Sequence, residues 1–253
     1  MRVTLLGTGT SQGVPVIGCD CEVCRSVDFR DQRLRASVHI QTETASIVID
    51  TGPDFRQQML RQRILTLDAV LFTHEHKDHT AGLDDIRAYN FRQNRDMPIF
   101  GRKSVLDTLK RDFAYAFSEY KYPGIPQMQL HEINGQPFDV AGLTVVPIQV
   151  MHYKLPVFGF RTGDFSYITD ANYIAEAELD KIRGSRVIVF DALQQEPHVS
   201  HFTLAQAVEI LTGLQPERAY LTHISHRMGL HREINRTLPP FIQLGYDGQR
   251  IEI

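Results

Sequence analysis

One short segment in the first third of the chain concentrates side chains that bind metals. Within Thr73–His79, three imidazoles and one carboxylate follow the order H-x-H-x-D-H, at His74, His76, Asp78 and His79. This density of nitrogen and oxygen donors suits a pair of divalent transition metals. The alternative is a polar loop rich in exposed histidine, because a short motif can match by chance. The donor set favours a dinuclear metal centre and makes the chain a candidate hydrolase.

The residues on either side of this segment predict how it is held. The apolar run 69–72 precedes it and is typical of a buried strand. If the chain stays extended past this run, the first two histidines point to one face. A turn would then bring the aspartate and the third histidine back toward that face, and the next helix would begin at Ala81.

This motif resembles that of the metallo-β-lactamase superfamily, in which further ligands come from the ends of later strands. Three later apolar runs each end at a suitable residue: His152, Asp170 and His223. The resemblance implies that one metal is bound by His74, His76 and His152. It implies that the other is bound by Asp78, His79 and His223, with Asp170 bridging the two and Asp78 counted with the catalytic residues. Asp50, in Ile49–Gly52, resembles the superfamily's Asp-x-Gly turn and is expected to orient a ligand.

A second candidate metal site lies near the N-terminus. Cys19, Cys21 and Cys24 form a C-x-C-x-x-C pattern, and three thiolates this close favour zinc. A closed structural site needs a fourth ligand, and His226 is our choice because it lies three residues after His223. The alternative is three free thiols in a flexible loop. The chain has only these cysteines, so they are no disulfide framework.

The N-terminal pattern narrows the resemblance. Gly7–Pro15, followed by the cysteine motif at 19–24, is similar to the phosphodiesterase branch associated with phosphonate breakdown, which includes a cyclic phosphodiesterase. Members of that branch carry the extra zinc, completed by a histidine shortly after the last active-site histidine. The accessory protein of pyrroloquinoline quinone synthesis resembles the pattern too.

Two histidines compete for the role of general acid. His201 is our choice because it directly precedes a predicted helix, as the general-acid histidine does in related phosphodiesterases and transfer-RNA 3′-processing enzymes. A non-ligand histidine that titrates near the operating pH suits acid catalysis. His198 is the alternative, and it could instead contact the substrate phosphate or be a solvated loop residue.

Composition bounds the class of protein. The chain has 253 residues, of which 42% are hydrophobic and 23% charged, with a net charge of −3. These values are ordinary for a globular protein, and no basic stripe typical of a nucleic-acid binder is present. No apolar run approaches the roughly 18 residues of a membrane span, and the apolar start of the chain is too short for a secretory signal. We therefore expect one domain over residues 1–253, in the cytoplasm and off the membrane.

The apolar and turn patterns predict strands and helices in alternation. Strands are predicted at 3–6, 38–41, 46–50, 69–72, 98–100, 143–150, 158–161, 165–169, 187–191 and 219–222. Helices are predicted at 53–63, 81–91, 103–116, 175–181, 204–213 and 231–238. The aromatic run 113–122 is expected to pack mostly into the core. This order suits an α/β fold with two sheets covered by helices, and it agrees with the αββα sandwich of two mixed sheets that the resemblance implies.

The function that follows is a dinuclear metal-dependent phosphodiesterase acting on small cyclic phosphates, such as 2′,3′-cyclic nucleotides or a ribosyl cyclic phosphate. Zinc or manganese is expected, although iron or nickel suits such donors too. One rival is a transfer-RNA 3′-processing endonuclease, which would need a basic arm; long nucleic acid is therefore not the expected partner. Other rivals are a thioesterase or lactonase, an iron oxidoreductase (whose relatives have Glu in place of His76) and a non-catalytic accessory protein. Relatives also suggest a homodimer, and the physiological substrate stays open.

Overall fold

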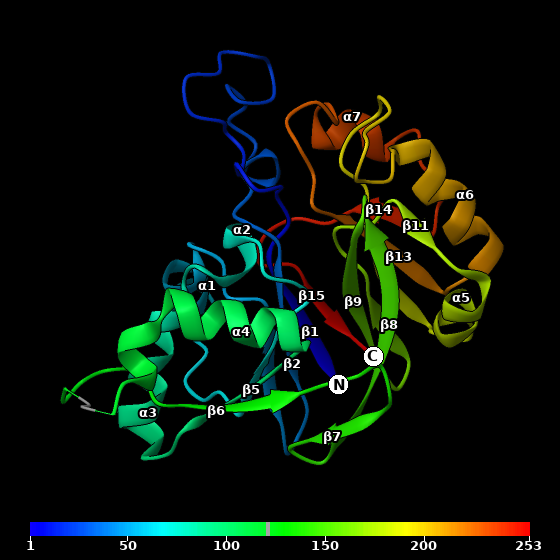
Figure 1. Ribbon diagram of the computed structural model, residues 1–253. Coiled ribbons are helices and arrows are strands. Elements are labelled where there is room, and N and C mark those ends of the chain that lie inside the picture. The colour runs from blue at the N-terminus through cyan, green and yellow to red at the C-terminus, as the bar shows by residue number, and fades with distance from the viewer. Residues whose placement is uncertain (120–121) are drawn as a thin grey trace.

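Two β-sheets pack face to face in the computed structural model, which describes residues 1–119 and 122–253 (Figure 1). The first sheet has the strand order β15-β1-β2-β3-β4-β5-β6 and the second β11-β8-β9-β10-β12-β13-β14, with β7 paired to β8. The first sheet consists of β1 Arg2–Gly7, β2 Ser37–Gln41, β3 Ser46–Ile49, β4 Ala69–Leu71, β5 Met97–Gly101, β6 Met128–Glu132 and β15 Arg250–Glu252. The second consists of β7 Phe138–Val140, β8 Leu143–His152, β9 Leu155–Thr162, β10 Phe165–Tyr167, β11 Tyr173–Ile174, β12 Val187–Asp191, β13 Arg218–Thr222 and β14 Ile242–Leu244.

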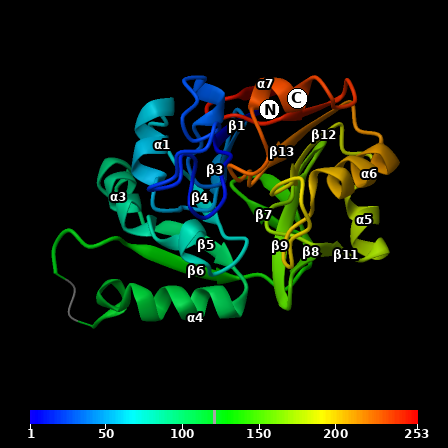
Figure 2. The same ribbon diagram turned by 90° about the horizontal axis from the view of Figure 1, so that it is seen from above.

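Helices cover the outer face of each sheet (Figure 2). The helices are α1 Phe55–Gln62, α2 Lys77–Thr80, α3 Arg87–Gln93, α4 Lys103–Asp112, α5 Glu176–Ile182, α6 Leu204–Leu214 and α7 His231–Asn235. Helices α1, α3 and α4 lie on the side of the first sheet, and α5 and α6 lie on the side of the second. The α/β class and the αββα order of layers are thereby confirmed. In the described part of the chain, no helix is long and apolar enough to cross a bilayer.

Alternation along the strands builds the central core. On β1 and β2, Val3, Leu5, Val38 and Ile40 point inward and are buried against residues of the second sheet such as Phe160. Because successive side chains of a strand point to opposite faces, the residues between them face outward. A second apolar cluster under α1, α3 and α4 and a third under α5 and α6 cover the two outer faces.

The structure corrects the prediction for the metal segment. Strand β4 ends at Leu71, and helix α2 begins at Lys77 rather than at Ala81. The predicted helix 81–91 is in fact α2, a 3₁₀ turn at Leu83–Ile86 and then α3. Asp78 and His79 thus lie in a helix of a single turn and not in a loop.

Short edge elements escaped prediction. Strands β7, β11, β14 and β15 have two or three residues each, too few for an alternating pattern to be visible. The predicted helix 103–116 ends at Asp112 and continues as a 3₁₀ turn, Ala114–Phe117. In the aromatic run, Phe113 packs on the outer core and Ala116 is buried as expected, but Tyr115 and Tyr122 are exposed, and Tyr120 and Lys121 lie outside the described residues.

One buried histidine predicts an acid sensitivity of the fold. His39 on β2 is 4% exposed, with Nε2 2.8 Å from the Ser46 hydroxyl, and burial lowers its pKa from 6.5 to about 4. In the unfolded chain, His39 binds a proton near its ordinary pKa. The stability that neutral, buried His39 contributes is therefore present above that ordinary pKa and is lost as pH falls toward the folded pKa. Between about pH 7 and pH 5 the wild type should lose free energy of unfolding as His39 tends to protonate. His39→Gln should lose about 2 kcal/mol less over the same range. Urea unfolding at the two pH values measures this, and equal losses in both proteins would contradict it.

Candidate metal centre and its general acid

The first group of donors brings together three histidines from two sheets. Ligand atoms of His74, His76 and His152 lie within 4.8 Å of one another. His74 Nε2 is 2.9 Å from His76 Nδ1, and the His152 ring lies 5.2 Å from that of His76. His152 is the last residue of β8, while the other two follow β4. The first predicted ligand set is therefore assembled in space.

The second group contains both carboxylates. Ligand atoms of Asp78, His79, Asp170 and His223 also lie within 4.8 Å of one another. The Asp170 carboxylate lies between the groups, since its Oδ1 is 3.2 Å from His223 Nε2 and 3.9 Å from His74 Nε2. Its other oxygen, Oδ2, is 3.2 Å from His79 Nε2. This is the position that a bridging ligand needs.

The chemistry of these donors fits divalent metals. The buried Nε2 atoms of His79 and His223 have no hydrogen-bond partner among the described residues, although carboxylate oxygens are 3.2 Å away. Lone pairs in such positions are available to a cation. Burial raises the pKa of the Asp170 carboxyl, but His223, His79 and His74 outweigh it and hold that pKa well below its usual value. Metal ligands must be deprotonated, so an ionised carboxylate among imidazoles that can give up their second proton is what two metals require.

Backbone strain is concentrated at the same place. Asp50, Asp170 and His223 have φ values of 66°, 52° and 60°, in the left-handed region that non-glycine residues seldom adopt. Each follows the buried end of a strand. Such conformations cost free energy and persist where surrounding contacts enforce them, commonly at functional sites.

Several ligands are oriented by hydrogen bonds. Asp50 is fully buried, and its Oδ2 lies 2.7 Å from His79 Nδ1 and accepts the Thr73 hydroxyl at 2.8 Å. His152 Nδ1 lies 2.8 Å from the carbonyl oxygen of Ser200. These contacts leave the other ring nitrogen of His79 and His152 to face the centre. The expectation that Asp50 orients a ligand agrees with this contact.

His201 lies against one ligand of each group. Its ring centre is 4.6 Å from that of His152 and 4.6 Å from that of His223. Its Nδ1 is 3.2 Å from Asp191 Oδ1. Burial lowers the pKa of His201, but the Asp191 carboxylate outweighs burial and raises it to about 8. Helix α6 begins at Leu204, with Thr203 as its N-cap, so the predicted placement before a helix is correct.

Asp191 is a further candidate site residue, which the sequence did not identify. It ends β12, accepts hydrogen bonds from the backbone N–H groups of Asp170 and Phe202, and faces His201. The sequence contained a sign of this residue, because Asp191, like Asp170, is a carboxylate at the end of an apolar run. His198, in contrast, is exposed, and its ring centre is 5.3 Å from that of His201.

The four residues of the second predicted site also converge. Nδ1 of His226 lies 3.3 Å from Cys19 Sγ, 3.4 Å from Cys21 Sγ and 3.5 Å from Cys24 Sγ. Ligands around a tetrahedral zinc are about 3.6 Å apart at normal bond lengths. A hydrogen bond from the Cys24 backbone N–H lowers the pKa of Cys21 to about 6, and burial raises that of Cys24 to about 11. The donor set fits zinc, which would tie the projecting loop between β1 and β2 to the segment after β13 (Figure 1).

Removing one thiolate should separate this site from the metal centre. We expect Cys21→Ser to lose one equivalent of zinc and to lower the melting temperature, while the metals at the histidine centre stay bound. Metal analysis and thermal unfolding measure the two effects. Full zinc content with an unchanged melting temperature would refute the structural zinc, and Ser26→Ala, in the same loop, controls for local disturbance.

The sequence of this chain is similar to those of known proteins. Residues 45–224 match the family described as "Beta-lactamase superfamily domain". The chain is 42% identical over 251 residues to a protein named "Octanoyltransferase" from Porphyromonas gingivalis, covering 98% of this chain and 51% of that protein. The chain thus spans about half the length of this curated relative.

Two solved structures show the same fold. A diphosphatase from the PhnP family superposes with a TM-score of 0.93 at 39% identity, covering 100% of this chain and 97% of that one. Zinc-bound PqqB from Methylobacterium extorquens superposes with a TM-score of 0.79 at 17% identity, covering 100% of both chains.

Proposed function

The chain belongs to the beta-lactamase superfamily and is a metal-dependent hydrolase; from this premise we propose that it is a dinuclear phosphodiesterase acting on small, including cyclic, phosphodiesters. The observation that carries the proposal is the position of His201. It contacts one residue of each donor group and is itself paired with Asp191. A general acid at this point suits substrates whose leaving group needs a proton.

The metals are proposed to be zinc or manganese, held by His74, His76, His152, Asp78, His79, Asp170 and His223. When bound, they would lower the pKa of a water molecule and neutralise charge on the phosphoryl oxygens. The two carboxylates cancel only part of the charge of two divalent cations. The positive balance favours an anionic substrate over a neutral ester or lactone.

The residues of the chain supply orientation and the proton. We infer that His201 donates its Nδ1–H to Asp191, which leaves Nε2 as the nitrogen that a departing oxygen can reach. The Asp191 carboxylate also accepts the backbone N–H of Asp170, so one group fixes both the acid and the bridging carboxylate. His198 is exposed beside this pair and is proposed to contact substrate rather than to protonate it.

Two related substrate classes deserve comparison. The similar diphosphatase suggests a phosphoric anhydride, whose phosphate leaving group needs less protonation than an alkoxide. The name of the P. gingivalis relative suggests acyl chemistry, but this chain spans about half of that protein. The three thiols of this chain all belong to the Cys–His site. We therefore place acyl thioesters second to phosphodiesters.

A substrate panel tests the proposal. Protein loaded with zinc or with manganese would be assayed on 2′,3′-cyclic nucleotides, bis-p-nitrophenyl phosphate, a nucleoside diphosphate ester, an octanoyl thioester and a lactone. We expect kcat/KM to be highest for the cyclic phosphodiesters. A higher value for the thioester or the lactone would overturn the phosphodiesterase, and a higher value for the diphosphate ester would replace it with a diphosphatase.

The setting of the enzyme is proposed from chemistry alone. The free thiols of the Cys–His site need a reducing compartment, which favours the cytoplasm. The net negative charge argues against long nucleic acid as a substrate. A homodimer remains a proposal, which sedimentation would test.

A further inference from the structure

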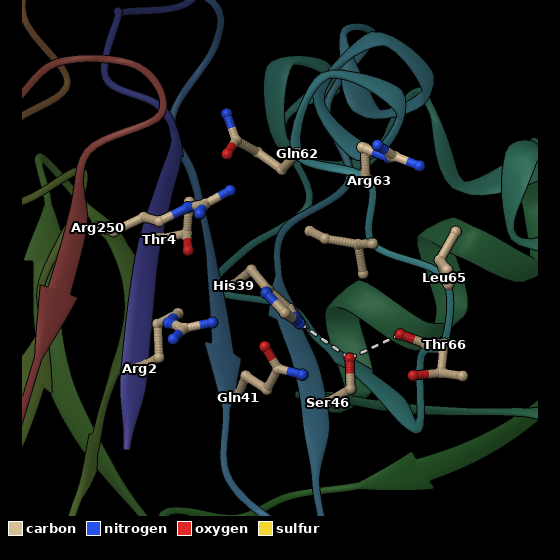
Figure 3. A pocket seen from close by; sticks show the side chains of 11 residues that line it. Arg2, Thr4, His39, Gln41, Ser46, Gln62, Arg63, Leu65, Thr66 and Arg250 are labelled. Carbon is tan, nitrogen blue, oxygen red and sulfur yellow. Dashed lines mark hydrogen bonds between the residues drawn. The ribbon is translucent and has the colours of Figure 1, made fainter.

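A polar cavity of about 290 Å³ opens on the outer face of the first sheet, away from the metal centre. Its walls come from β15, β1, β2 and the start of β3, and from the end of α1 with the segment after it (Figure 3). Ser46, in the wall, begins β3, whereas Asp50 at the metal centre follows the end of that strand. Four residues of strand separate them by about 13 Å.

Among the described residues, three guanidinium groups line this cavity, and no Asp or Glu does. Arg2 pairs with Glu252 at 2.6 Å, whereas Arg63 and Arg250 form no ion pair with any residue in ranges 1–119 and 122–253. The whole chain is acidic, with a net charge of −3, so this concentration of positive charge is local. Like charges gathered around one small cavity repel one another unless an anion lies between them.

The geometry lets two of these cations act together. Arg2 and Arg250 lie diagonally across the β1–β15 pair, because Thr4 is the register partner of Arg250 and Glu252 that of Arg2. Residues in this relation have Cα atoms about 7–8 Å apart, within reach of one shared anion. Figure 3 shows both side chains extending from their strands over the cavity, whereas Arg63 lies on the opposite wall with its side chain directed away from them.

Two hydrogen bonds link three residues that line the cavity: His39, Ser46 and Thr66. The Ser46 hydroxyl donates to the carbonyl oxygen of Thr66 at 2.6 Å and accepts from His39 Nε2 at 2.8 Å. These groups are satisfied and neutral, so recognition is left to the arginines and to amide side chains such as Gln41 and Gln62. Guanidinium groups bind phosphate oxygens with two parallel N–H···O bonds.

We propose that this cavity binds a small, multiply charged phosphate-type oxyanion, at a site separate from the metal centre. Arg2, Arg63 and Arg250 are its charged contacts. The volume suits a diphosphate group better than a whole large cofactor. The anion could be free diphosphate or the diphosphate part of a nucleotide, and both share this chemistry.

Arginine modification by phenylglyoxal, read out by peptide mass spectrometry, locates binding at this cavity in the metal-loaded enzyme. If diphosphate binds with a Kd of about 1 mM, then about 10 mM diphosphate should slow modification of Arg63 and Arg250 about tenfold. Arg236, the exposed C-cap residue that follows α7, should not be slowed. Protection by ADP and by orthophosphate is measured in the same way. Stronger protection by ADP than by diphosphate would identify a nucleotide, and the reverse would identify the free anion.

A variant distinguishes a specific anion-binding site from non-specific screening of positive charge by the added anion. In Arg250→Gln, we expect diphosphate to protect Arg63 at least about fivefold less, with turnover at the metal centre unchanged. The matched control, Arg236→Gln, should leave the protection of Arg63 intact. Equal protection of Arg236 in the wild type, no protection of Arg63 and Arg250, or unaltered protection of Arg63 in Arg250→Gln would each overturn the site.

Discussion

Replacing His201 with alanine is expected to lower turnover at least about a hundredfold on substrates that release an alkoxide, while both metals stay bound. An alkoxide is a poor leaving group without a proton, and His201 is the buried histidine that contacts a ligand of each donor group. Because His201 is hydrogen-bonded to Asp191 and is not one of the seven proposed ligands, its loss should leave the ligands in place. Turnover of a 2′,3′-cyclic nucleotide, together with metal analysis of the variant, measures both effects.

The leaving group and a neighbouring histidine provide the controls. With bis-p-nitrophenyl phosphate, whose leaving group departs without protonation, His201→Ala should lose much less activity than with the cyclic nucleotide. His198→Ala should lose less than His201→Ala on every substrate, because His198 is exposed and has no carboxylate partner among the described residues. Near wild-type turnover of a cyclic nucleotide by His201→Ala would show that His201 is not the general acid. A larger loss in His198→Ala than in His201→Ala would assign that role to His198.

Much of this centre could be predicted because its ligands lie where strands end. His152, Asp170 and His223 each terminate or follow an apolar strand, and a strand end is visible in the sequence. Spacing in the sequence does not, however, show which ends meet. The grouping of ligands came from a family resemblance, and only the packing of the two sheets brings the ends of β4, β8, β10 and β13 together.

The local path of the metal segment could not be predicted, because backbone contacts from a distant turn decide it. The N–H of Thr51 donates to the carbonyl oxygen of His79 at 2.7 Å, and that of Gly82 donates to the carbonyl oxygen of Thr51 at 2.8 Å. A Cβ atom on Gly52 would overlap the carbonyl oxygen of Asp78, and one on Gly82 would overlap that of Gly52. Two glycines therefore allow the turn after β3 to pack directly on α2. This contact between residues about thirty positions apart accompanies the early start of the helix, which local propensity did not indicate.

The pairing of Asp191 with His201 illustrates the same limit in the site. Both residues were visible, one as the end of a strand and the other as a histidine before a helix. Their contact depends on how the segment from β12 to α6 folds back, with the N–H of Phe202 donating to the carbonyl oxygen of Ala171 at 2.7 Å and to Asp191 Oδ2 at 3.2 Å. Apolar patterns describe strands and helices well, but they carry no information on the path of such a connection.

Asp170→Asn is expected to have the largest effect of any single change at the centre. The amide keeps the shape of the side chain but removes the charge of a carboxylate that lies within 3.9 Å of His74, His79 and His223. Without that charge two divalent cations would repel each other across the shared position, so we expect the variant to bind less than one equivalent of metal there. Loss of a group that merely orients a ligand costs about 10–100-fold, and loss of a shared ligand should cost at least about a thousandfold in turnover.

Metal stoichiometry distinguishes this loss from unfolding. The Cys–His site shares no residue with the donor groups around Asp170, so Asp170→Asn should still bind one equivalent of zinc there and keep its fold by circular dichroism. Asp164→Asn is the matched control, because Asp164 is an exposed aspartate only six positions away whose carboxylate pairs with Arg186 at 3.7 Å. If Asp170→Asn retained two metals at the histidine centre and turned over at the wild-type rate, Asp170 would not bridge anything. The two metals would then be held separately by His74, His76 and His152 and by Asp78, His79 and His223, with no shared carboxylate.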